Sequence, residues 1–450
     1  MIYLNAILAM LAVLSLALAL WQWFAARRFP LHRRLPLNSQ PLGAAKRSED
    51  GSSLNRISPG ITVLKPLKGC DGTTADSLRS WFKQDYTGPM QILFGVADAD
   101  DPVCKIVREL IAENPQFDSQ LVVCDPLVGA NAKVAKLVQL ERLAKHELIL
   151  VSDADVRVPP DFLVNVVAPL NEEDRAALPR RQAEQRLGPA GSMEVATASR
   201  ARGEIGLVSC FYRLANPTTA AMQWEAVAIN ADFWSQVLQA ATLKPLDFAL
   251  GAVMLTRRQL LEEIGGFTAL ADCLADDYQL GHRIAGKGHR IALCPVVVEC
   301  WDAPMNWSDV WKHQLRWART IRVCQPLPYF FSILANATFW PLLWLVSELP
   351  RLSATATQTM DSGADQTFSV ESGFPYGIVV AIAILLIRIV LAQDFQRRLN
   401  GIANLNFFWL VPVKDLLQVA IWFGAFAGRT VEWRGRRMKL RRDGTLVEVI

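Results

Sequence analysis

Groups of two or three aspartates follow three apolar stretches of the sequence, and these aspartates are the residues best suited to do chemistry. The stretches read VADADDP (96–102), VSDADVRVPPDF (151–162) and LADDYQLGHRI (274–284). Two carboxylates on one face of an extended turn can hold a hard divalent cation, which in turn neutralises a diphosphate. For any one pair, a solvated turn that caps the next helix is an equally simple explanation. Three such groups in this order favour a binding site, with the candidates Asp98, Asp100, Asp101, Asp153, Asp155, Asp276 and Asp277.

Five short apolar stretches are the elements that must position these carboxylates. They cover residues 61–69, 90–98, 147–155, 206–210 and 289–300, and segments with helical spacing separate several of them. Strands that alternate with helices predict a parallel sheet covered on both faces. In such a sheet, ligands bind beyond the carboxyl ends of the strands, which is where the aspartates stand. The segment 171–203 has no apolar periodicity, and we expect it to be a surface insertion.

Other catalytic motifs are missing from the sequence. It contains no GxGxxG, no GxxxxGK[ST], no GxSxG and no HExxH pattern, which removes support for dinucleotide, P-loop, serine-hydrolase and zinc-protease chemistry. The eight cysteines form no CxxC pair, which favours a reduced, cytosol-facing domain. The net charge of +4 is small, and the basic residues cluster beside apolar segments, at 27–56 and 429–442. This distribution suits the cytoplasmic side of a membrane and predicts no nucleic-acid partner.

The first 26 residues carry no charge and are dominated by Leu and Ala. About 20 apolar residues are enough to cross the hydrocarbon core of a bilayer. A cleaved signal peptide fits poorly, because the run is long, lacks a basic start and ends in Trp21, Trp23 and Arg27. We therefore expect a transmembrane helix over 1–26, followed by a basic linker over 27–60.

Three further apolar segments lie in the last third of the chain. Segments 329–349 and 374–393 are each long enough to span a membrane. Segment 405–427 differs, because it contains Pro412 and Lys414. Proline breaks a helix interior, and a lysine at the bilayer centre costs about 3 kcal/mol on insertion scales. We therefore expect a re-entrant or interfacial pair of helices there.

The distribution of charge predicts the orientation of these segments. Lys and Arg mark the cytoplasmic side of membrane proteins. They follow segment 1–26 and are dense in the tail 428–450, whereas the loop 351–373 holds one base and three acids. The predicted catalytic domain, residues 61–325, is therefore expected to face the cytoplasm. The Ala-, Leu- and Arg-rich composition favours a bacterial chain, hence a multi-pass protein of the bacterial inner (cytoplasmic) membrane.

Seven stretches of the chain carry a family resemblance. They are LKPLKGCDG, VADADDP, NAKVAKL, VSDADVRVPPDFL, LADDYQLGHRIAGKGHRI, RWART and the tail EWRGRRMKLRRDGTLVEVI. In this order they resemble processive-type GT-A glycosyltransferases, and more narrowly the ceramide glucosyltransferases and their bacterial relatives, the hopanoid biosynthesis-associated glycosyltransferases. The resemblance covers nearly the whole chain. It implies an α/β GT-A domain (Rossmann-like, with a mostly parallel sheet), flanked by N-terminal and C-terminal transmembrane helices, and an inverting sugar transfer from a UDP-sugar.

The resemblance also implies roles for individual residues. Nucleotide-sugar binding is assigned to Asp98, Asp100, Asp101, Lys133 and Asp153. Asp153 and Asp155 would hold Mg²⁺ or Mn²⁺. Asp277 would be the general base that deprotonates the acceptor hydroxyl, and the like charge of Asp276 would raise the pKa of Asp277.

The stretch HQLRWART (313–320) has two interpretations. A tryptophan beside an arginine ahead of an apolar run is often an anchor at a membrane surface. The resemblance instead places Arg316 and Trp317 in a (Gln/Arg)xxArgTrp motif, with His313 at the first position. In that motif the guanidinium offers a fork of donors to the diphosphate and the indole forms a wall of the pocket. We favour the binding site, and a lipid acceptor would allow both.

The sequence therefore predicts a membrane glycosyltransferase that moves a sugar from UDP to the hydroxyl of a lipid acceptor. A hopanoid polyol with UDP-N-acetylglucosamine is favoured over a ceramide with UDP-glucose. A polysaccharide synthase is a further alternative, although three or four apolar segments are few to line a polymer channel. A non-enzymatic membrane scaffold would leave the carboxylates unexplained. The expected partners are the UDP-sugar, the lipid acceptor and the bilayer.

Overall fold

The structure, a computed structural model, describes residues 2–35, 58–125, 129–171, 203–361, 376–401, 409–433, 436–441 and 443–448. The chain divides into two compact units. The sheet unit comprises Pro30–Pro217, Ala240–Pro304 and Thr430–Ile450, and the helical unit comprises Met1–Phe29, Thr218–Gln239 and Met305–Arg429. Most of the predicted linker (27–60) and nearly all of the predicted insertion (171–203) lie outside the described residues.

The described part of the sheet unit contains an eight-stranded sheet in the order β3-β2-β1-β4-β7-β6-β8-β5. Its strands are β1 (Ile61–Pro66), β2 (Met90–Val96), β3 (Asp118–Val123), β4 (Leu148–Ser152), β5 (Val156–Arg157), β6 (Ile205–Leu214), β7 (Val253–Arg257) and β8 (Arg290–Cys300). The β1–β2, β2–β3, β1–β4 and β6–β8 pairs are parallel. The β4–β7, β6–β7 and β5–β8 pairs are antiparallel. The prediction of a mostly parallel sheet in an α/β domain is confirmed.

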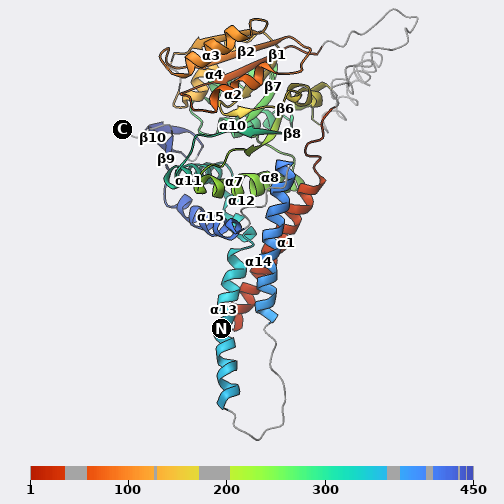
Figure 1. Ribbon diagram of the computed structural model, residues 1–450, viewed down its shortest axis with the longest axis vertical. Coiled ribbons are helices and arrows are strands. Elements are labelled where there is room, and N and C mark those ends of the chain that lie inside the picture. The colour runs from red at the N-terminus through yellow and green to blue at the C-terminus, as the bar shows by residue number, and fades with distance from the viewer. Residues whose placement is uncertain are drawn as a thin grey trace, which may run out of the picture. The chain divides into compact units, whose positions relative to one another are not determined.

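Helices cover both faces of this sheet, as Figure 1 shows for α2, α3 and α4. Along β4, Leu148 and Leu150 join one apolar cluster, whereas Ile149 and Val151 join the other. A strand buried on both faces must be apolar throughout, which explains the uninterrupted run LILV. The first cluster includes side chains of α2 (Thr74–Arg79), η1 (Ser80–Phe82), α3 (Val103–Glu113) and the helix Phe162–Asn171. The second includes side chains of α4 (Ala132–Leu143), α9 (Arg258–Glu263), η3 (Phe267–Leu270) and α10 (Asp276–Gly286).

The carboxyl ends of the parallel strands meet at one edge of the sheet. β1, β2 and β4 are neighbours that run in the same direction, so the loops after them emerge at this edge. The loop after β2 carries Asp98, and the loop after β4 carries Asp153 and Asp155. The third acidic pair, Asp276–Asp277, begins α10.

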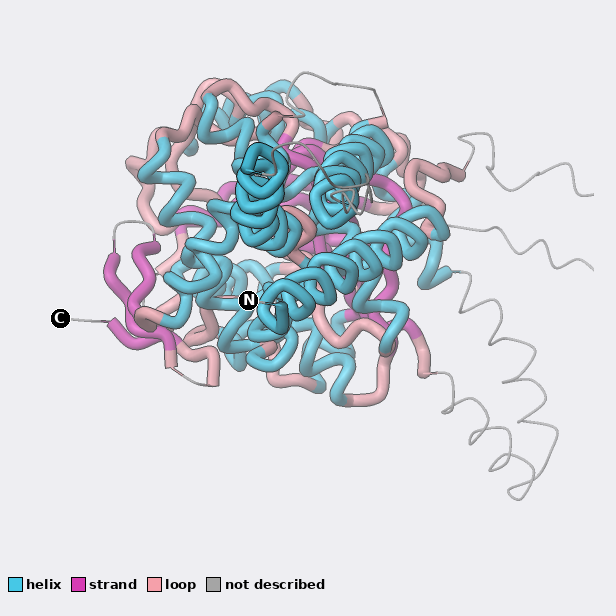
Figure 2. The backbone as a smooth tube through the Cα atoms, turned by 90° about the horizontal axis from the view of Figure 1, so that it is seen from below, coloured by secondary structure: helices cyan, strands magenta, loops and turns pink. Residues whose placement is uncertain are grey.

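The predicted basic tail forms a second sheet, which is antiparallel and three-stranded in its described residues. Its strands, seen just before the C label in Figure 2, are β9 (Thr430–Trp433), β10 (Arg436–Leu440) and β11 (Leu446–Glu448). On β10, Met438 and Leu440 are buried while Arg437 and Lys439 are exposed. The alternation of basic and apolar residues is thus that of a strand with one buried face, and the tail is a folded part of the sheet unit.

The helical unit contains a bundle of long helices. Its described elements are α1 (Ile2–Arg28), α7 (Ala220–Val227), the π-helix η2 (Ala228–Phe233), α8 (Trp234–Leu243, whose end belongs to the sheet unit), α11 (Trp307–Cys324), α12 (Pro326–Phe331), η4 (Ser332–Ala335), α13 (Phe339–Asp361), α14 (Tyr376–Asn400) and α15 (Leu410–Phe426). α1, α13 and α14 lie side by side (Figure 1). The small side chains of Ala12 and Ala381 pack there with Trp344.

Two described helices are long and apolar enough to cross a membrane, Tyr3–Arg28 and Tyr376–Asn400. They coincide with the predicted segments 1–26 and 374–393, so apolar helices near both ends of the chain are confirmed. The predicted segment 329–349 falls on two shorter helices, Pro326–Ala335 and Phe339–Pro350, which are bent by 45° and would together make a third span.

The described part of segment 405–427 is one helix, α15. Pro412 was expected to break this segment and does not. It is the third residue of the helix, where a backbone N–H has no partner within the helix in any case. The proline therefore lies in the first turn of α15 and does not interrupt the helix.

The charge of Lys414 is neutralised inside the helical unit. Its ammonium contacts Asp232 and lies 2.7 Å from Asp415 Oδ1. Arg388 of α14 binds the same two carboxylates, with Nε 2.8 Å from Asp415 Oδ2 and Nη2 2.9 Å from Asp232 Oδ2. All four side chains are at least nine-tenths buried, and their formal charges cancel. The cost expected for an isolated lysine in this segment therefore does not apply, because paired charges are far cheaper to bury than single ones.

Candidate active site

Lys133 links two of the acidic motifs in the sheet unit. Its Nζ lies 2.7 Å from Asp153 Oδ1 and 2.9 Å from Asp276 Oδ2. The side chains of Lys133 and Asp276 are about nine-tenths buried, while that of Asp153 is 40% exposed. The contact with Asp276 is that of an ion pair, since Oδ2 accepts no hydrogen bond of good geometry from the described residues. One ammonium thus holds the loop after β4 beside the start of α10.

The sequence NAK places this lysine through helix capping. The Asn131 side chain caps α4 by accepting hydrogen bonds from the backbone N–H groups of Lys133 and Val134. Its Nδ2 donates to the carbonyl of Cys273, 2.8 Å away, and its backbone N–H donates to the carbonyl of Ala271. The first turn of α4 is therefore tied to the segment just ahead of Asp276.

The charges around Lys133 decide its protonation. Burial alone disfavours the ammonium, but the carboxylates of Asp153 and Asp276 outweigh burial and raise the pKa of Lys133. The lysine therefore stays cationic at neutral pH and is a fixed positive charge at the carboxyl edge of the sheet.

Asp277 lies beside this ion pair in a half-buried position. Its Oδ1 accepts a hydrogen bond from the backbone N–H of Tyr278 at 2.7 Å. Gly251 makes room for the other oxygen, since a Cβ at that position would lie 2.7 Å from Asp277 Oδ2. Burial, and after it the charge of Asp276, raises the pKa of Asp277 to about 6. A carboxylate with a pKa this close to neutrality is suited to general-base work.

Lys65, which sequence analysis missed, is fully buried and interacts electrostatically with the half-buried Asp155. Its ammonium donates to Ser152 Oγ at 3.2 Å and to the backbone carbonyl of Asp153, and it lies 5.0 Å from the ring centre of Trp81. Burial lowers the pKa of Lys65 to about 7, and burial together with the charges of nearby aspartates raises that of Asp155 to about 7. The signal in the sequence was a lysine inside the apolar run ITVLKP, where solvation is impossible.

A divalent cation is compatible with these residues. Within the described part of the chain, no group of three or more His, Cys, Asp and Glu side chains could hold a metal ion alone. Mg²⁺, however, is usually held by one or two carboxylates together with the phosphates of a substrate. Asp153 and Asp155 provide two carboxylates, and burial, followed by the charges of Asp302 and Asp153, raises the pKa of Asp155, an effect that a bound cation would oppose. The pair fits a metal shared with a nucleotide.

The three aspartates after β2 differ in what they do. Asp101 accepts hydrogen bonds from the backbone N–H groups of Gly69, at 2.9 and 3.0 Å, and of Val103, at 3.0 Å. It therefore braces the loop that follows β1. Asp98 and Asp100 are exposed, and Asp98 Oδ1 accepts from the Asp100 N–H. These two remain the better candidates for contact with a nucleotide.

The predicted His313, Arg316 and Trp317 belong to the helical unit, on α11. The three lie on one face of that helix, since residues three and four apart are neighbours there. The His313 ring packs edge-to-face on Trp317, with centroids 4.6 Å apart. His313 Nδ1 and Gln314 Nε2 each lie 2.8 Å from Glu225 Oε1. Glu225 of α7 is fully buried and was missed by sequence analysis, because nothing in AAMQWEAV marks its glutamate as different from a surface residue.

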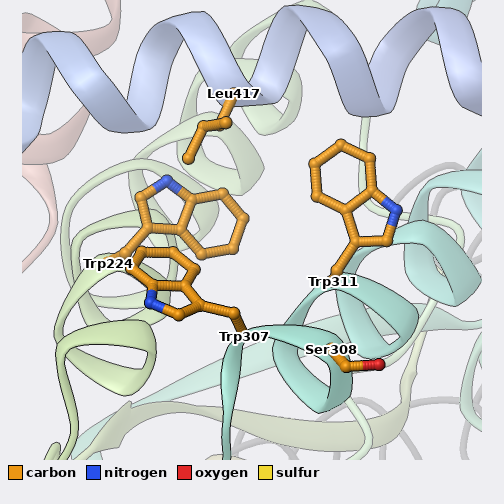
Figure 3. Close-up of a pocket in the computed structure, with 5 residues that line it drawn as sticks. All are labelled: Trp224, Trp307, Ser308, Trp311 and Leu417. Carbon is orange, nitrogen blue, oxygen red and sulfur yellow. The ribbon is translucent and has the colours of Figure 1, made fainter.

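An apolar cavity of about 320 Å³ lies in the same unit. Figure 3 shows its lining, which consists of Trp224, Trp307, Ser308, Trp311 and Leu417. The indoles of Trp224 and Trp307 pack at 6.2 Å, and Trp307 is half exposed. The lining offers aromatic and aliphatic surface with one hydroxyl.

The sequence profile of glycosyl transferase family 21 matches residues 7–181 and 186–446 of the chain. The chain belongs to glycosyl transferase family 21. It is 22% identical over 235 residues to ceramide glucosyltransferase 3 of Caenorhabditis elegans, which covers 52% of this chain and 44% of the relative. It is 31% identical over 150 residues to the ceramide glucosyltransferase of Candida albicans, covering 31% of this chain and 28% of that one. The chain thus spans less than half the length of these curated relatives.

Solved structures also resemble the chain. The mannosyltransferase PcManGT from Pyrobaculum calidifontis, in complex with GDP-Man and Mn²⁺, has a TM-score of 0.43 and 19% sequence identity, with 92% of this chain and 99% of that one covered. The glucosyl-3-phosphoglycerate synthase from Mycobacterium tuberculosis has a TM-score of 0.30 and 16% identity, with 55% and 73% covered. Family membership confirms the predicted enzyme class, a glycosyltransferase, while the narrower hopanoid-associated resemblance stays a prediction.

Proposed function

We propose that the protein is an inverting glycosyltransferase that moves a sugar from a UDP-sugar to the hydroxyl group of a membrane lipid. The observation that carries the proposal is the position of Asp277, beside an ammonium held between Asp153 and Asp276. Transfer from a nucleotide diphosphate requires a base that accepts the proton of the acceptor. It also requires positive charge that stabilises the leaving diphosphate. Family membership supports the reaction class, and the membrane-length helices support a lipid acceptor.

In the proposed mechanism Asp277 takes up the proton of the acceptor hydroxyl. The hydroxyl oxygen forms a bond to the anomeric carbon, the bond from that carbon to the diphosphate breaks on the opposite side, and UDP leaves with the bonding electrons. The attack in line with the leaving group inverts the anomeric configuration. Lys133 supplies positive charge at this edge of the sheet. For His313, Arg316 and Trp317, the proposal of donor binding rests on the family motif alone.

Two donor and acceptor pairs compete within this proposal. The Ala-, Leu- and Arg-rich composition, typical of a bacterial chain, favours UDP-N-acetylglucosamine and a hopanoid polyol. The names of the curated relatives favour a ceramide acceptor, with UDP-glucose as donor. A polysaccharide synthase is less well supported, because the described residues provide two membrane-length helices, or three with the bent pair. Assays of purified protein with each UDP-sugar and each lipid, followed by mass spectrometry of the product, distinguish the three.

We further propose that Asp153 and Asp155 hold Mg²⁺ or Mn²⁺ jointly with the phosphates of the donor. A bound cation would supply positive charge to the leaving diphosphate. We expect EDTA to abolish activity, and Asp153→Ala to lower both activity and the binding of Mn²⁺ in the presence of UDP, measured by electron paramagnetic resonance. Asp76→Ala, which removes an exposed carboxylate of α2, serves as the control. Full activity in chelator would contradict the metal, though not the transfer reaction.

The proposed location is the bacterial inner membrane, with the catalytic domain in the cytoplasm. Labelling of single cysteines from each side of sealed vesicles checks this, on a background in which the eight native cysteines are replaced. Cysteines placed in 355–370 should react from outside, whereas Arg397→Cys and Lys439→Cys, both at exposed positions, should react only from inside. External labelling at position 439 would mean one more span than proposed.

A further inference from the structure

The C-terminal turn of the chain is hydrogen-bonded to the segment that leads into the proposed base. The backbone N–H of Leu446 donates to the carbonyl of Asp272 at 2.7 Å, and the N–H of Leu274 donates to the carbonyl of Gly444 at 3.3 Å. Between these two bonds, Cys273 and Thr445 form an antiparallel bridge. The end of the chain therefore adds a short strand to residues 272–274, two residues ahead of Asp276.

The turn that presents this strand is built by its own residues. Asp443 accepts hydrogen bonds from the backbone N–H of Thr445 at 3.0 Å and from its hydroxyl at 2.7 Å. Gly444 has φ +83°, a left-handed conformation that favours glycine. The Arg441 N–H closes the hairpin on the Thr445 carbonyl at 2.8 Å. The sequence DGT is thus suited to a tight turn between β10 and β11.

The opposite side of segment 272–274 is held by the first turn of α4. Asn131 Nδ2 donates to the Cys273 carbonyl at 2.8 Å, and the Ala130 N–H donates to Asp272 Oδ1 at 2.9 Å. Cys273 and Leu446 are both more than nine-tenths buried. The segment therefore lies between the helix that carries Lys133 and the C-terminal strand, with backbone hydrogen bonds on both sides.

We propose that the C-terminal turn, formed by residues 441 and 443–446, is a positioning element of the active site. It holds segment 272–274 against α4, so that Asp276 meets Lys133 and Asp277 keeps its place at the start of α10. The role assigned to Asp277 rests on the proposed function. The basic residues of this tail predicted only that it lies on the cytoplasmic side, and the hydrogen bonds of Gly444 and Leu446 add a role within the sheet unit.

Leu446→Pro tests the proposal in the full-length protein, because it removes the N–H that bonds Asp272. Leu446→Ala is the matched control, since it keeps that N–H and shortens the side chain. A catalytic group that is misplaced by about 1 Å can cost about 10²-fold in rate. We therefore expect kcat to fall by about 10–100-fold in the proline variant. The KM for the UDP-sugar should change by less than about 2-fold, and Leu446→Ala should stay close to wild type.

Hydrogen exchange separates positioning from general unfolding. In Leu446→Pro, the peptide around residues 270–280 should lose protection while β4 keeps it. A wild-type kcat in Leu446→Pro would overturn the proposal. Equal losses of kcat in Leu446→Pro and Leu446→Ala, with protection from hydrogen exchange lost across the sheet, would overturn it as well. If Asp277→Asn lowers kcat and Leu446→Pro does not, the positioning role fails and the proposed function stands. An inactive wild-type enzyme with every UDP-sugar and lipid would instead remove the proposed function.

A cross-link provides a test that does not depend on a proline. Cys273 and Thr445 are a pair without hydrogen bonds between them, and the Cα atoms of such pairs lie about 4.5 Å apart, within the range of a disulfide. Oxidised Thr445→Cys should therefore form a disulfide with the native Cys273 and keep its activity. Failure to form it, or activity that is lost on oxidation and regained on reduction, would show that the strand is not docked during turnover.

Discussion

Replacing Asp277 with asparagine is expected to lower kcat by about 10²–10⁴-fold while the binding of UDP-sugar is retained. The substitution keeps the size of the side chain and its hydrogen bond from the Tyr278 N–H, but it removes the proton acceptor. Steady-state kinetics with saturating donor measure the first effect, and calorimetric titration with UDP-sugar measures the second. Asp276→Asn is the control within the same motif and should cost less, because Asp276 acts through Lys133.

The pH dependence of the reaction provides a second measurement on the same residue. The base works only when it is ionised, and burial raises the pKa of Asp277 to about 6, with Asp276 adding to the shift and Lys133 opposing it. Because the carboxylate is protonated at low pH, kcat/KM should be low below about pH 5, rise through about pH 6 and level off above about pH 7. A wild-type rate in Asp277→Asn, or an unchanged acidic limb in that variant, would rule out this base.

Replacing Lys133 with methionine is expected to lower the free energy of unfolding by about 3–5 kcal/mol and to abolish transfer. Removing one member of a buried ion pair leaves an uncompensated buried charge, and losses of about this size follow. Here the charge left behind is that of Asp276, whose side chain is only 10% exposed. Chemical denaturation of the detergent-solubilised protein, followed by a signal from the sheet unit, measures the change.

Lys145 provides a matched control for this variant. Its Nζ lies 2.7 Å from Asp118 Oδ2, the same distance as in the Lys133–Asp153 pair, but the side chains of Lys145 and Asp118 are both exposed. Lys145→Met should therefore change the free energy of unfolding by no more than about 1 kcal/mol. Lys133→Met combined with Asp276→Asn should regain much of the stability, though not the activity. Equal losses in Lys133→Met and Lys145→Met would contradict the account of the buried pair.

Much of the sheet unit could be predicted from the sequence, because burial on both faces of a parallel sheet forces continuous apolar runs. The run LILV of β4 is one example, and the carboxylates that follow such runs necessarily emerge at the same edge. The same reasoning applies to α1, because residues 2–26 of this helix carry no charge and are long and apolar enough to cross a membrane. In both cases the local sequence is enough to predict that the segment is surrounded by apolar groups.

The features that the sequence did not reveal depend on contacts between distant residues. Glu225 is buried because of its surroundings in the fold, and its neighbouring sequence gives no sign of this, whereas the apolar run around Lys65 indicates burial but not the groups that Lys65 contacts. Pro412 was predicted to interrupt a helix but lies in the first turn of α15, because periodicity alone does not locate the first turn. The pairing of Leu446 with Asp272 joins residues 174 positions apart, and no local pattern encodes such a contact.

One measurement tests most directly whether the protein transfers a sugar from UDP to a lipid hydroxyl. Purified protein is incubated with Mg²⁺ or Mn²⁺, a panel of UDP-sugars and a bacterial lipid extract, and the lipids are then analysed by mass spectrometry. We expect one lipid class to gain the mass of a hexose or an N-acetylhexosamine, with release of UDP, in the wild-type sample and not in Asp277→Asn. Absence of any glycosylated lipid with every donor, or the same product at the same rate from Asp277→Asn, would contradict the account.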